Sequence, residues 1–286
     1  MRIRGPVALG LLAPAVVLMV LLYVIPLGSY LINSFHLFKD GRILPVWTLR
    51  TYVEYFTDPF SYKIIGESIR LSSIVTGLAL LIGYPIAYAL HTRVSSPAAR
   101  AVVSLLIFSP LVVSVVVRTY GWFILLAGQG LVNTVLLRTG VIGQPLSLLF
   151  NATGVVISLT HILLPFAIFP IYSVMGRLEI SLKEAARDLG AGWWETFRHI
   201  TLPLTMPGVV AGALICFTLA LSAFVTPRLL GGGRVQVMPL AVYNNTVEIN
   251  WPSGAVTGLA LLLMSVAAVW ALNALLRRLP SIEASR

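Results

Sequence analysis

The chain has 286 residues, of which 58% are apolar and only 10% are charged, and its mean hydropathy is +0.92. A water-soluble domain is closer to half apolar and a quarter charged, so this composition excludes an ordinary soluble protein and predicts one solvated mainly by lipid. The net charge of +10 does not indicate nucleic-acid binding, because the basic residues are scattered singly. The single cysteine, Cys216, lies in an apolar run and excludes a disulfide framework.

Six apolar stretches are long enough to cross a bilayer, which needs about 20 helical residues. Each must be a helix, since a spanning segment has to satisfy its own backbone hydrogen bonds, so we predict an all-α integral membrane protein with six transmembrane helices. The first stretch is too long for a cleaved signal peptide and lacks a small-x-small cleavage pattern. The stretches are Val7–Leu31, Leu71–Leu90, Ala101–Leu126, Gly154–Met175, Gly208–Val225 and Ala255–Leu276.

The basic residues predict that both termini are cytoplasmic. With that orientation, eleven Lys and Arg residues lie inside and six outside, as the positive-inside rule requires. The inside set is Arg2, Arg4, Arg93, Arg100, Arg177, Lys183, Arg187, Arg198, Arg277, Arg278 and Arg286. The outside set is Lys39, Arg42, Arg50, Lys63, Arg138 and Arg234.

None of the ten acidic residues lies within a predicted span, and Glu67 comes closest, just before the second. Ion-coupled carriers keep carboxylates inside the membrane to bind the driving ion. The sequence therefore disfavours an ion-coupled carrier. A membrane-embedded enzyme is disfavoured as well, because no nucleophile, base or metal-ligand set is clustered.

The loop at 178–206 is the most charged segment of the chain. Ser181 to Glu184 fits a capping box at the start of a helix, and Gly190 and Gly192 suit a left-handed stop and turn. A second short helix, Trp193–Ile200, is expected to end before Pro203, because the residue before a proline avoids helical geometry. These features fit either a solvated connector, with its aromatic residues at the lipid interface, or a rigid docking segment.

One motif in this loop resembles a known signature. Glu184-Ala185-Ala186, three residues, Gly190, nine residues, and then Ile200-Thr201-Leu202-Pro203 match the EAA signature of permease subunits of ABC importers. In that family the segment docks into a groove on the cytoplasmic ATPase. The resemblance implies a docking core of Glu184, Ala185, Ala186 and Gly190, with Asp188 and Leu189 as neighbours.

Further motifs resemble the spermidine/putrescine branch of these importers, in particular the first of its two permease subunits. They are Arg118-Thr119-Tyr120-Gly121-Trp122, Leu164-Pro165, Thr226-Pro227 with Leu230-Gly231-Gly232, and Asn250-Trp251-Pro252. The resemblance implies the type I importer permease fold over residues 64–277, with a coupling loop at 178–206. Residues 1–63 would hold the first span and an extracytoplasmic loop, and 278–286 a cytoplasmic tail.

The resemblance also implies an inner-membrane subunit that is not itself an enzyme. Its partners would be a second permease subunit, a cytoplasmic ATPase dimer, an extracytoplasmic solute-binding protein and membrane lipid. The chain itself would hold no cofactor, with ATP and magnesium on the ATPase, and the sequence contains no G-x-x-x-x-G-K-[ST] phosphate loop. The branch favours a polyamine as solute; an anionic or zwitterionic solute such as an aminophosphonate is the alternative.

Five residues are candidates for the translocation path: Arg118, Tyr120, Trp122, Tyr172 and Phe224. Arg118 lies in an apolar run and fits a path residue as well as an interface arginine near the outer leaflet. The aromatic candidates suit packing as well as a cavity wall. We expect His161 to make a hydrogen bond between helices, and Arg228 to anchor a helix at the outer edge.

Small and ring-constrained residues predict where helices approach or bend. Gly208-xxx-Gly212 and Gly254-xxx-Gly258 would let helix backbones approach closely. Four prolines are expected to break or bend their spans, namely Pro85, Pro110, Pro165 and Pro170.

Overall fold

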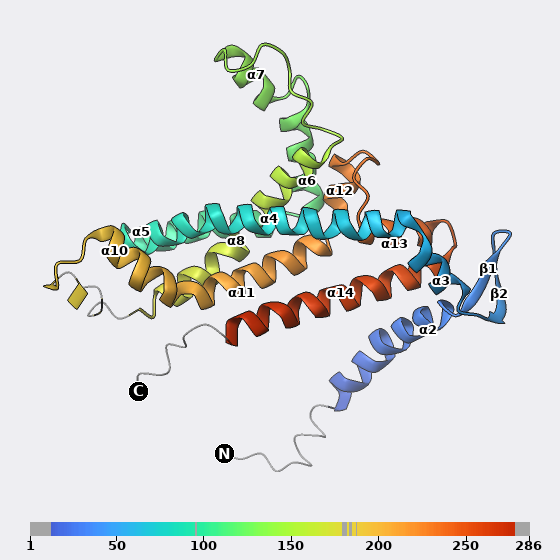
Figure 1. Cartoon of the computed structure of the whole chain (residues 1–286). Coiled ribbons are helices and arrows are strands. Elements are labelled where there is room, and N and C mark those ends of the chain that lie inside the picture. Colours follow the sequence, from blue (N-terminus) through green and yellow to red (C-terminus); the bar gives the residue numbers. More distant parts are fainter. Residues whose placement is uncertain (1–12, 95, 179–181, 183–184, 187, 278–286) are drawn as a thin grey trace. The chain divides into compact units, whose positions relative to one another are not determined.

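The computed structural model describes residues 13–94, 96–178, 182, 185–186 and 188–277 (Figure 1). Within these residues, six helical segments are long and apolar enough to cross a membrane. They are Ala13–Asn33, Pro59–Thr92, Val115–Arg138, Ala152–Met175, Trp193–Leu221 and Trp251–Ala274. The third of these is interrupted by a turn at 127–130. The prediction of a helical membrane protein with six spans is confirmed, although several boundaries differ.

The chain divides into two compact units, which we describe separately. The first comprises residues 1–63 and 241–262. Its described part contains η1 (Val20–Val24), α2 (Ile25–Asn33), β1 (His36–Lys39), β2 (Arg42–Trp47) and α3 (Arg50–Thr57), with the first part of α4 (Pro59–Thr92) and parts of α13 (Met238–Val247) and α14 (Trp251–Arg277).

A β-hairpin follows α2 and is the one departure from an all-helical chain among the described residues. Its strands pair antiparallel, with Leu37 opposite Leu44 and Phe38 opposite Ile43. The turn residues Asp40 and Gly41 both have positive φ, 52° and 73°. Two left-handed residues form a type I′ turn, whose twist matches that of the paired strands.

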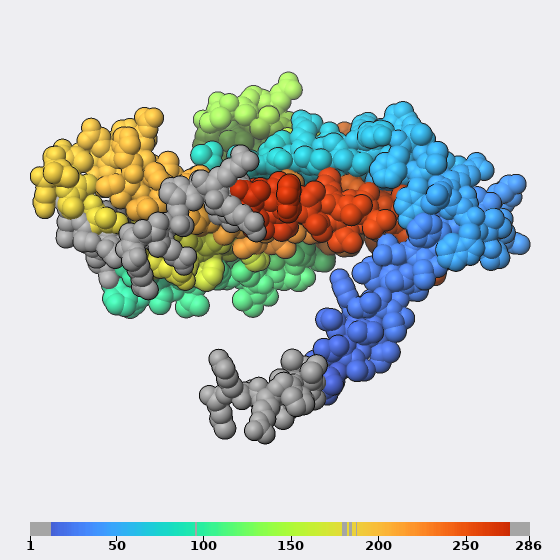
Figure 2. Space-filling model, turned by 60° about the horizontal axis from the view of Figure 1, so that its bottom comes forward, coloured from blue at the N-terminus to red at the C-terminus, as the bar shows by residue number. Residues whose placement is uncertain are grey.

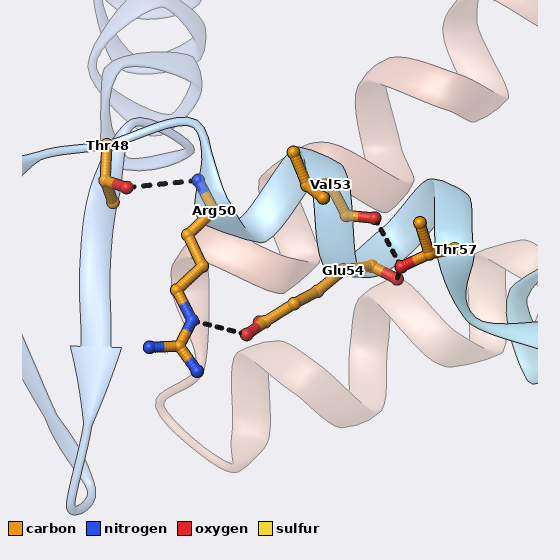
Figure 3. A network of polar contacts seen from close by, with 5 residues as sticks. All are labelled: Thr48, Arg50, Val53, Glu54 and Thr57. Carbon is orange, nitrogen blue, oxygen red and sulfur yellow. Dashed lines mark hydrogen bonds and ion pairs between the residues drawn. The ribbon is translucent and has the colours of Figure 1, made fainter.

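Helix α3 begins immediately after the hairpin, and its start is fixed by side chains (Figure 3). The Thr48 hydroxyl accepts a hydrogen bond from the Arg50 backbone N–H at 3.1 Å. One turn later, the Arg50 guanidinium pairs with Glu54 at 2.6 Å, while Thr57 donates to the Val53 carbonyl. Such an exposed ion pair adds little stability, so these contacts mainly define where the helix starts and ends.

Within this first unit, Gly254 of α14 lies against Tyr30 of α2. A Cβ at Gly254 would meet the Tyr30 hydroxyl at 2.5 Å, and that hydroxyl lies 3.2 Å from the hydroxyl of Thr246. Gly254 thus makes room for a side chain, and no backbone atom lies among its nearest neighbours, so the predicted backbone approach is not found here. At Gly258 the nearest atom would be 3.9 Å away, so this glycine makes no such approach.

The second unit comprises residues 64–240 and 263–286. Its described part holds most of α4 (Pro59–Thr92) together with α5 (Pro97–Val112), α6 (Val115–Leu126), α7 (Leu131–Arg138), α8 (Ala152–Met175), α10 (Trp193–Thr196), η2 (Phe197–Thr201), α11 (Leu202–Leu221), α12 (Val225–Leu230), the first residues of α13 (Met238–Val247) and the end of α14 (Trp251–Arg277). Its core is formed largely by buried aliphatic side chains of α4, α8 and α11.

Helices α8 and α11 lie side by side in this unit, and two glycines set their spacing (Figure 1). A Cβ at Gly208 would lie 2.9 Å from the Pro170 carbonyl oxygen and 3.0 Å from the Ile171 Cα. At Gly212 it would lie 3.2 Å from the Ala167 carbonyl oxygen. Because the obstacles are backbone atoms, a side chain at Gly208 would push the helices apart and one at Gly212 would require a smaller shift, as the Gly208-xxx-Gly212 spacing predicts.

The third predicted span, Ala101–Leu126, is not one helix. It divides between α5 and α6 at Val113 and Ser114, which both have extended ψ angles, 136° and 139°. The ring of Pro110 removes a backbone donor near the end of α5, and the valines on both sides of the break are weak helix formers. The single-helix prediction was wrong, because hydropathy does not register a break inside an apolar run.

Helix α4 is longer than predicted and includes one acidic residue. Its 34 residues rise about 50 Å, well beyond the hydrocarbon thickness of about 30 Å. Glu67 lies within this helix, 25 residues before its end, and pairs with Arg70 at 3.1 Å. A helix of this length has room for its charged first turns outside the apolar layer, where Glu67 and Arg70 would be solvated.

Three of the four prolines do not interrupt their helices. Assigned helix continues through Pro85 in α4 and through Pro165 and Pro170 in α8. Of these four prolines only Pro110 precedes a break, so a break is confirmed at that position, while a bend at the other three stays a prediction.

Candidate functional site

The segment that carries the EAA-like motif is helical where it is described. Leu182, Ala185, Ala186 and Asp188 are helical, and Leu189 and Gly190 form the turn that ends the helix. Glu184 and the predicted cap residue Ser181 lie outside the described residues. We call residues 182–192 the coupling segment below.

The stop at Gly190 has the predicted geometry. Gly190 adopts a φ of +86°, and the Ala191 N–H donates to the Ala186 carbonyl at 3.0 Å. This bond over five residues is the Schellman arrangement, which places a left-handed residue just after the last helical turn. Because a side chain disfavours that φ, glycine suits this position specifically.

Gly192 differs from Gly190 and corrects the prediction. Its φ is −67° and its ψ is 168°, so it is extended rather than left-handed, and it is the N-cap of α10. Its N–H donates to the Glu195 carboxylate at 3.1 Å. The next helix thus starts directly after the turn, and Trp193 is its first residue.

The prediction that this second helix ends before Pro203 was wrong. Residues 193–221 form one continuous helical segment, within which η2 is a π-helix. The Leu202 N–H bonds to the Phe197 carbonyl, one residue further back than in an α-helix. The wider turn and the position of Pro203 in the first turn of α11 let the helix continue, because a donor missing there costs little.

Figure 2 shows the yellow to gold part of the chain, which includes the end of the coupling segment, at the surface of the molecule, and Leu182 and Leu189 of this segment are both exposed. Leu189 is 89% exposed, although it is a large aliphatic residue beside a charged one, Asp188. Ala185 is exposed and Ala186 is buried. An exposed leucine at a helix end is an apolar surface group, as contact surfaces have.

A cavity of about 400 Å³ lies in the second unit, between α5, α6, α8, the end of α11 and α12. Arg118 and Phe224 line it, together with apolar residues such as Leu159 and Phe166. Two guanidinium nitrogens of Arg118, Nε and Nη1, are buried and have no hydrogen-bond acceptor among the described residues. Two of the five path candidates are thus brought to one cavity.

The other three path candidates lie elsewhere. Tyr120 is 53% exposed and does not line this cavity. Trp122 donates from its indole N–H to Nδ1 of His161 at 3.2 Å, joining α6 to α8. The helix-to-helix role predicted for His161 is therefore confirmed. Tyr172 lines a separate, smaller cavity of about 190 Å³ with Phe108 and Phe169.

The connections of the second unit gather at two opposite ends of its helices. At one end, Tyr88 of α4 contacts Trp193 of α10, which brings the end of α4 beside the coupling segment. At the other end, the Phe150 N–H donates to the Leu230 carbonyl at 2.7 Å, and Ser68 accepts from the Met238 N–H. The connections after α4 and α8 thus share one side, as the predicted topology requires.

Comparison with protein families agrees with this arrangement. Residues 78–280 match the family described as binding-protein-dependent transport system inner membrane component. This match covers most of the chain, including the coupling segment and the cavity. The chain belongs to this family of permeases.

Two relatives of this permease carry a more specific description. It is 33% identical over 240 residues to the spermidine/putrescine transport system permease protein PotB of Haemophilus influenzae, covering 82% of this chain and 83% of that protein. It is 34% identical over 242 residues to PotB of Escherichia coli K12, covering 83% and 87%. The resemblance to the spermidine/putrescine branch is confirmed.

A solved structure supports the fold of the permease. A chain of a bacterial ABC transporter that imports the acidic polysaccharide alginate superposes with a TM-score of 0.75, covering 96% of both chains at 19% identity. At this identity the likeness establishes the fold alone. Together with the six apolar helices, the family identifies a multi-pass protein of the inner membrane.

Sequence reasoning missed the residues of α4 that face the coupling side. Tyr84 and Tyr88 contact Phe197, and Tyr88 also accepts a hydrogen bond from Trp193. Their spacing of four residues places both on one face of α4. That spacing is the one signal that was available, but tyrosines four apart are also ordinary in apolar helices.

Proposed function

We propose that the permease is a subunit of an ATP-driven importer of polyamines such as spermidine and putrescine. The observation that carries this proposal is its similarity to the PotB proteins over more than 80% of the chain. The EAA-like motif supports the same importer class, since its described residues form a rigid helix end closed by Gly190.

The proposal includes a complete assembly around this chain. A second permease subunit would complete the membrane part, and an extracytoplasmic binding protein would deliver the solute. An ATPase dimer would bind ATP and magnesium, so this chain acts as a transport subunit without a cofactor of its own. Both termini and the coupling segment would face the cytoplasm, as the eleven-to-six distribution of basic residues favours.

We propose that the coupling segment docks on the ATPase, and the exposure of Leu189 and the closed turn at Gly190 support this. The nearly fully exposed Leu189 and the neighbouring Asp188 lie at the helix end, next to a turn fixed by two backbone features. A short segment with a closed turn would move as a unit when a bound partner is displaced, whereas a flexible loop would not. Glu184 belongs to this proposed dock through the motif alone.

The solute path is proposed to pass the cavity that Arg118 and Phe224 line. A polyamine is a cation, and Arg118 is a fixed cation on the cavity wall, so this site would not hold the solute tightly. Aromatic faces contribute about 0.5–2 kcal/mol each to a bound cation, which is enough to guide it without trapping it. Selectivity would then reside mainly in the binding protein.

Uptake by the whole assembly tests this function. Radiolabelled putrescine, spermidine and an aminophosphonate would be offered to vesicles that contain both permeases, the ATPase and the binding protein. We expect ATP-dependent uptake of at least one polyamine, and we expect Arg118→Gln to retain it. Uptake of the aminophosphonate alone, lost in Arg118→Gln while the ATPase stays bound, would instead favour the anionic solute.

A further inference from the structure

Five aromatic rings meet where α4 ends and α10 begins. Trp193 and Trp194 of α10 each stack on Phe197, with ring centres 5.6 Å apart in both cases. Tyr88 and Tyr84 of α4 approach the same phenylalanine edge-on, at 5.7 Å and 6.0 Å. We call these five residues the aromatic cluster.

Two hydrogen bonds fasten the cluster to α4 and α11. The Trp193 indole N–H donates to the Tyr88 hydroxyl at 3.0 Å. One helical turn away, the Tyr84 hydroxyl lies 2.9 Å from the Thr205 hydroxyl of α11. Each tyrosine of α4 is therefore tied by its ring and by its hydroxyl to the chain that follows the coupling segment.

The cluster follows the coupling segment directly in the chain, through a turn closed by hydrogen bonds. Ala191 is bonded back to the preceding helix, and Gly192 is capped by Glu195, so Trp193 follows a closed turn. On the far side of Trp193, the π-helix at Phe197–Thr201 has wider turns than the α-helix that follows. Such π-helical turns often mark functional sites in helices.

We propose that the aromatic cluster is the mechanical link that passes a displacement of the coupling segment to α4, with the Trp193–Tyr88 hydrogen bond as its key contact. This inference rests on the proposed function, because it assumes that an ATPase moves the coupling segment. Trp193 and Tyr88 are positioning residues: they touch neither solute nor nucleotide, and they act through the helices they join.

The chain offers a matched control for this link. Trp193 and Trp194 are adjacent, are 60% and 59% exposed, and both stack on Phe197. Among the described residues, only Trp193 uses its indole N–H to reach α4. If these rings served simply as interfacial anchors, the two tryptophans would be equivalent.

The first measurement is the ATP hydrolysed per polyamine imported by the assembly. Trp193→Phe replaces the indole with a phenyl ring and Tyr88→Phe removes only a hydroxyl, so both keep an aromatic ring and lose the same hydrogen bond. We expect each to raise the ratio about fivefold, as loss of one hydrogen bond of about 1 kcal/mol would allow, with unchanged ATPase binding. The double variant should be no worse than either single variant, and Trp194→Phe should match wild type.

The second measurement does not depend on transport. Spin labels at Thr92→Cys and Gly192→Cys report the distance between the end of α4 and the coupling segment without ATP. The native thiol of Cys216 is buried, so it stays in place. We expect a narrow distance distribution in wild type and in Trp194→Phe, and a broad one in Trp193→Phe and Tyr88→Phe.

Unchanged ratios and distances in Trp193→Phe and Tyr88→Phe would overturn the link, as would an equal effect of Trp194→Phe. If the wild-type assembly imports no polyamine while the distance distribution still broadens in Trp193→Phe and Tyr88→Phe, the proposed substrate fails. In that case the link between the coupling segment and α4 stands.

Discussion

Helix α8 contacts α11 and α6 in different ways. Towards α11 the helices meet at backbone distance, because Gly208 and Gly212 offer no side chain. Towards α6 a side-chain hydrogen bond joins Trp122 to His161, and a cavity of about 400 Å³ lies beside this interface. The first contact is close and extensive, whereas fewer residues join α8 to α6. A transport cycle that opens this unit should therefore act on the α6 side.

The largest expected effect comes from separating α8 and α11 at their glycine contact. Gly208→Leu would place a side chain against the Pro170 carbonyl oxygen and the Ile171 Cα, which are backbone atoms and cannot rotate away. We expect a loss of about 3 kcal/mol or more and little folded permease in detergent, measured by size-exclusion chromatography.

Gly77→Leu is the control for this substitution. Gly77 also lies within a membrane helix, α4, but a Cβ there meets no atom within 4 Å. Its yield should match wild type. Equal losses in both variants would mean that any bulky residue disturbs insertion, and the close approach at Gly208 would not be the cause.

A smaller effect is expected where the chain turns between α8 and α11. Gly190 and Gly192 both have open space where a Cβ would lie, but only Gly190 has a positive φ. Gly190→Ala should cost about 1–2 kcal/mol through backbone strain, while Gly192→Ala should cost almost nothing. The measurements are hydrogen exchange over residues 185–192 and the amount of ATPase that co-purifies. Identical behaviour of the two variants would refute the strained turn.

The smallest effect concerns the interface between α6 and α8. His161→Phe retains an aromatic ring but loses the acceptor for Trp122, and Trp122→Phe loses the donor. Hydrogen bonds between membrane helices are worth about 0.6 kcal/mol on average, so each variant should be only slightly less stable. A double-mutant cycle, followed by unfolding in mixed detergent, measures the coupling. A coupling energy above about 2 kcal/mol would contradict the weak interface between α6 and α8 that we infer.

The two interfaces of α8, with α11 and with α6, also show what the sequence could predict. The glycine pair on α11 and the interhelical role of His161 were both predicted, because small residues and isolated polar groups in apolar helices have few uses. The start of α8 was placed within two residues, near a cap in which Asn151 accepts from the Gly154 N–H. Local residue chemistry was sufficient for each of these features.

Other features were not predictable in the same way. The break between α5 and α6 lies within valines, where hydropathy stays high although the backbone changes direction. The Trp193–Tyr88 contact joins residues 105 positions apart, which no local pattern encodes. The hairpin turn at Asp40-Gly41 is different, since an Asp-Gly pair between apolar residues was visible but was not interpreted.

The π-helix at Phe197–Thr201 has a consequence for how this helix tolerates length changes. A π-helical turn holds about one residue more than an α-helical turn, so it is equivalent to a single inserted residue. Deleting one residue there would return the turn to α geometry and leave the flanking faces nearly in register. The same deletion within α11 would rotate everything before it by about 100°. A one-residue deletion within Phe197–Thr201 should therefore leave Gly208 facing α8.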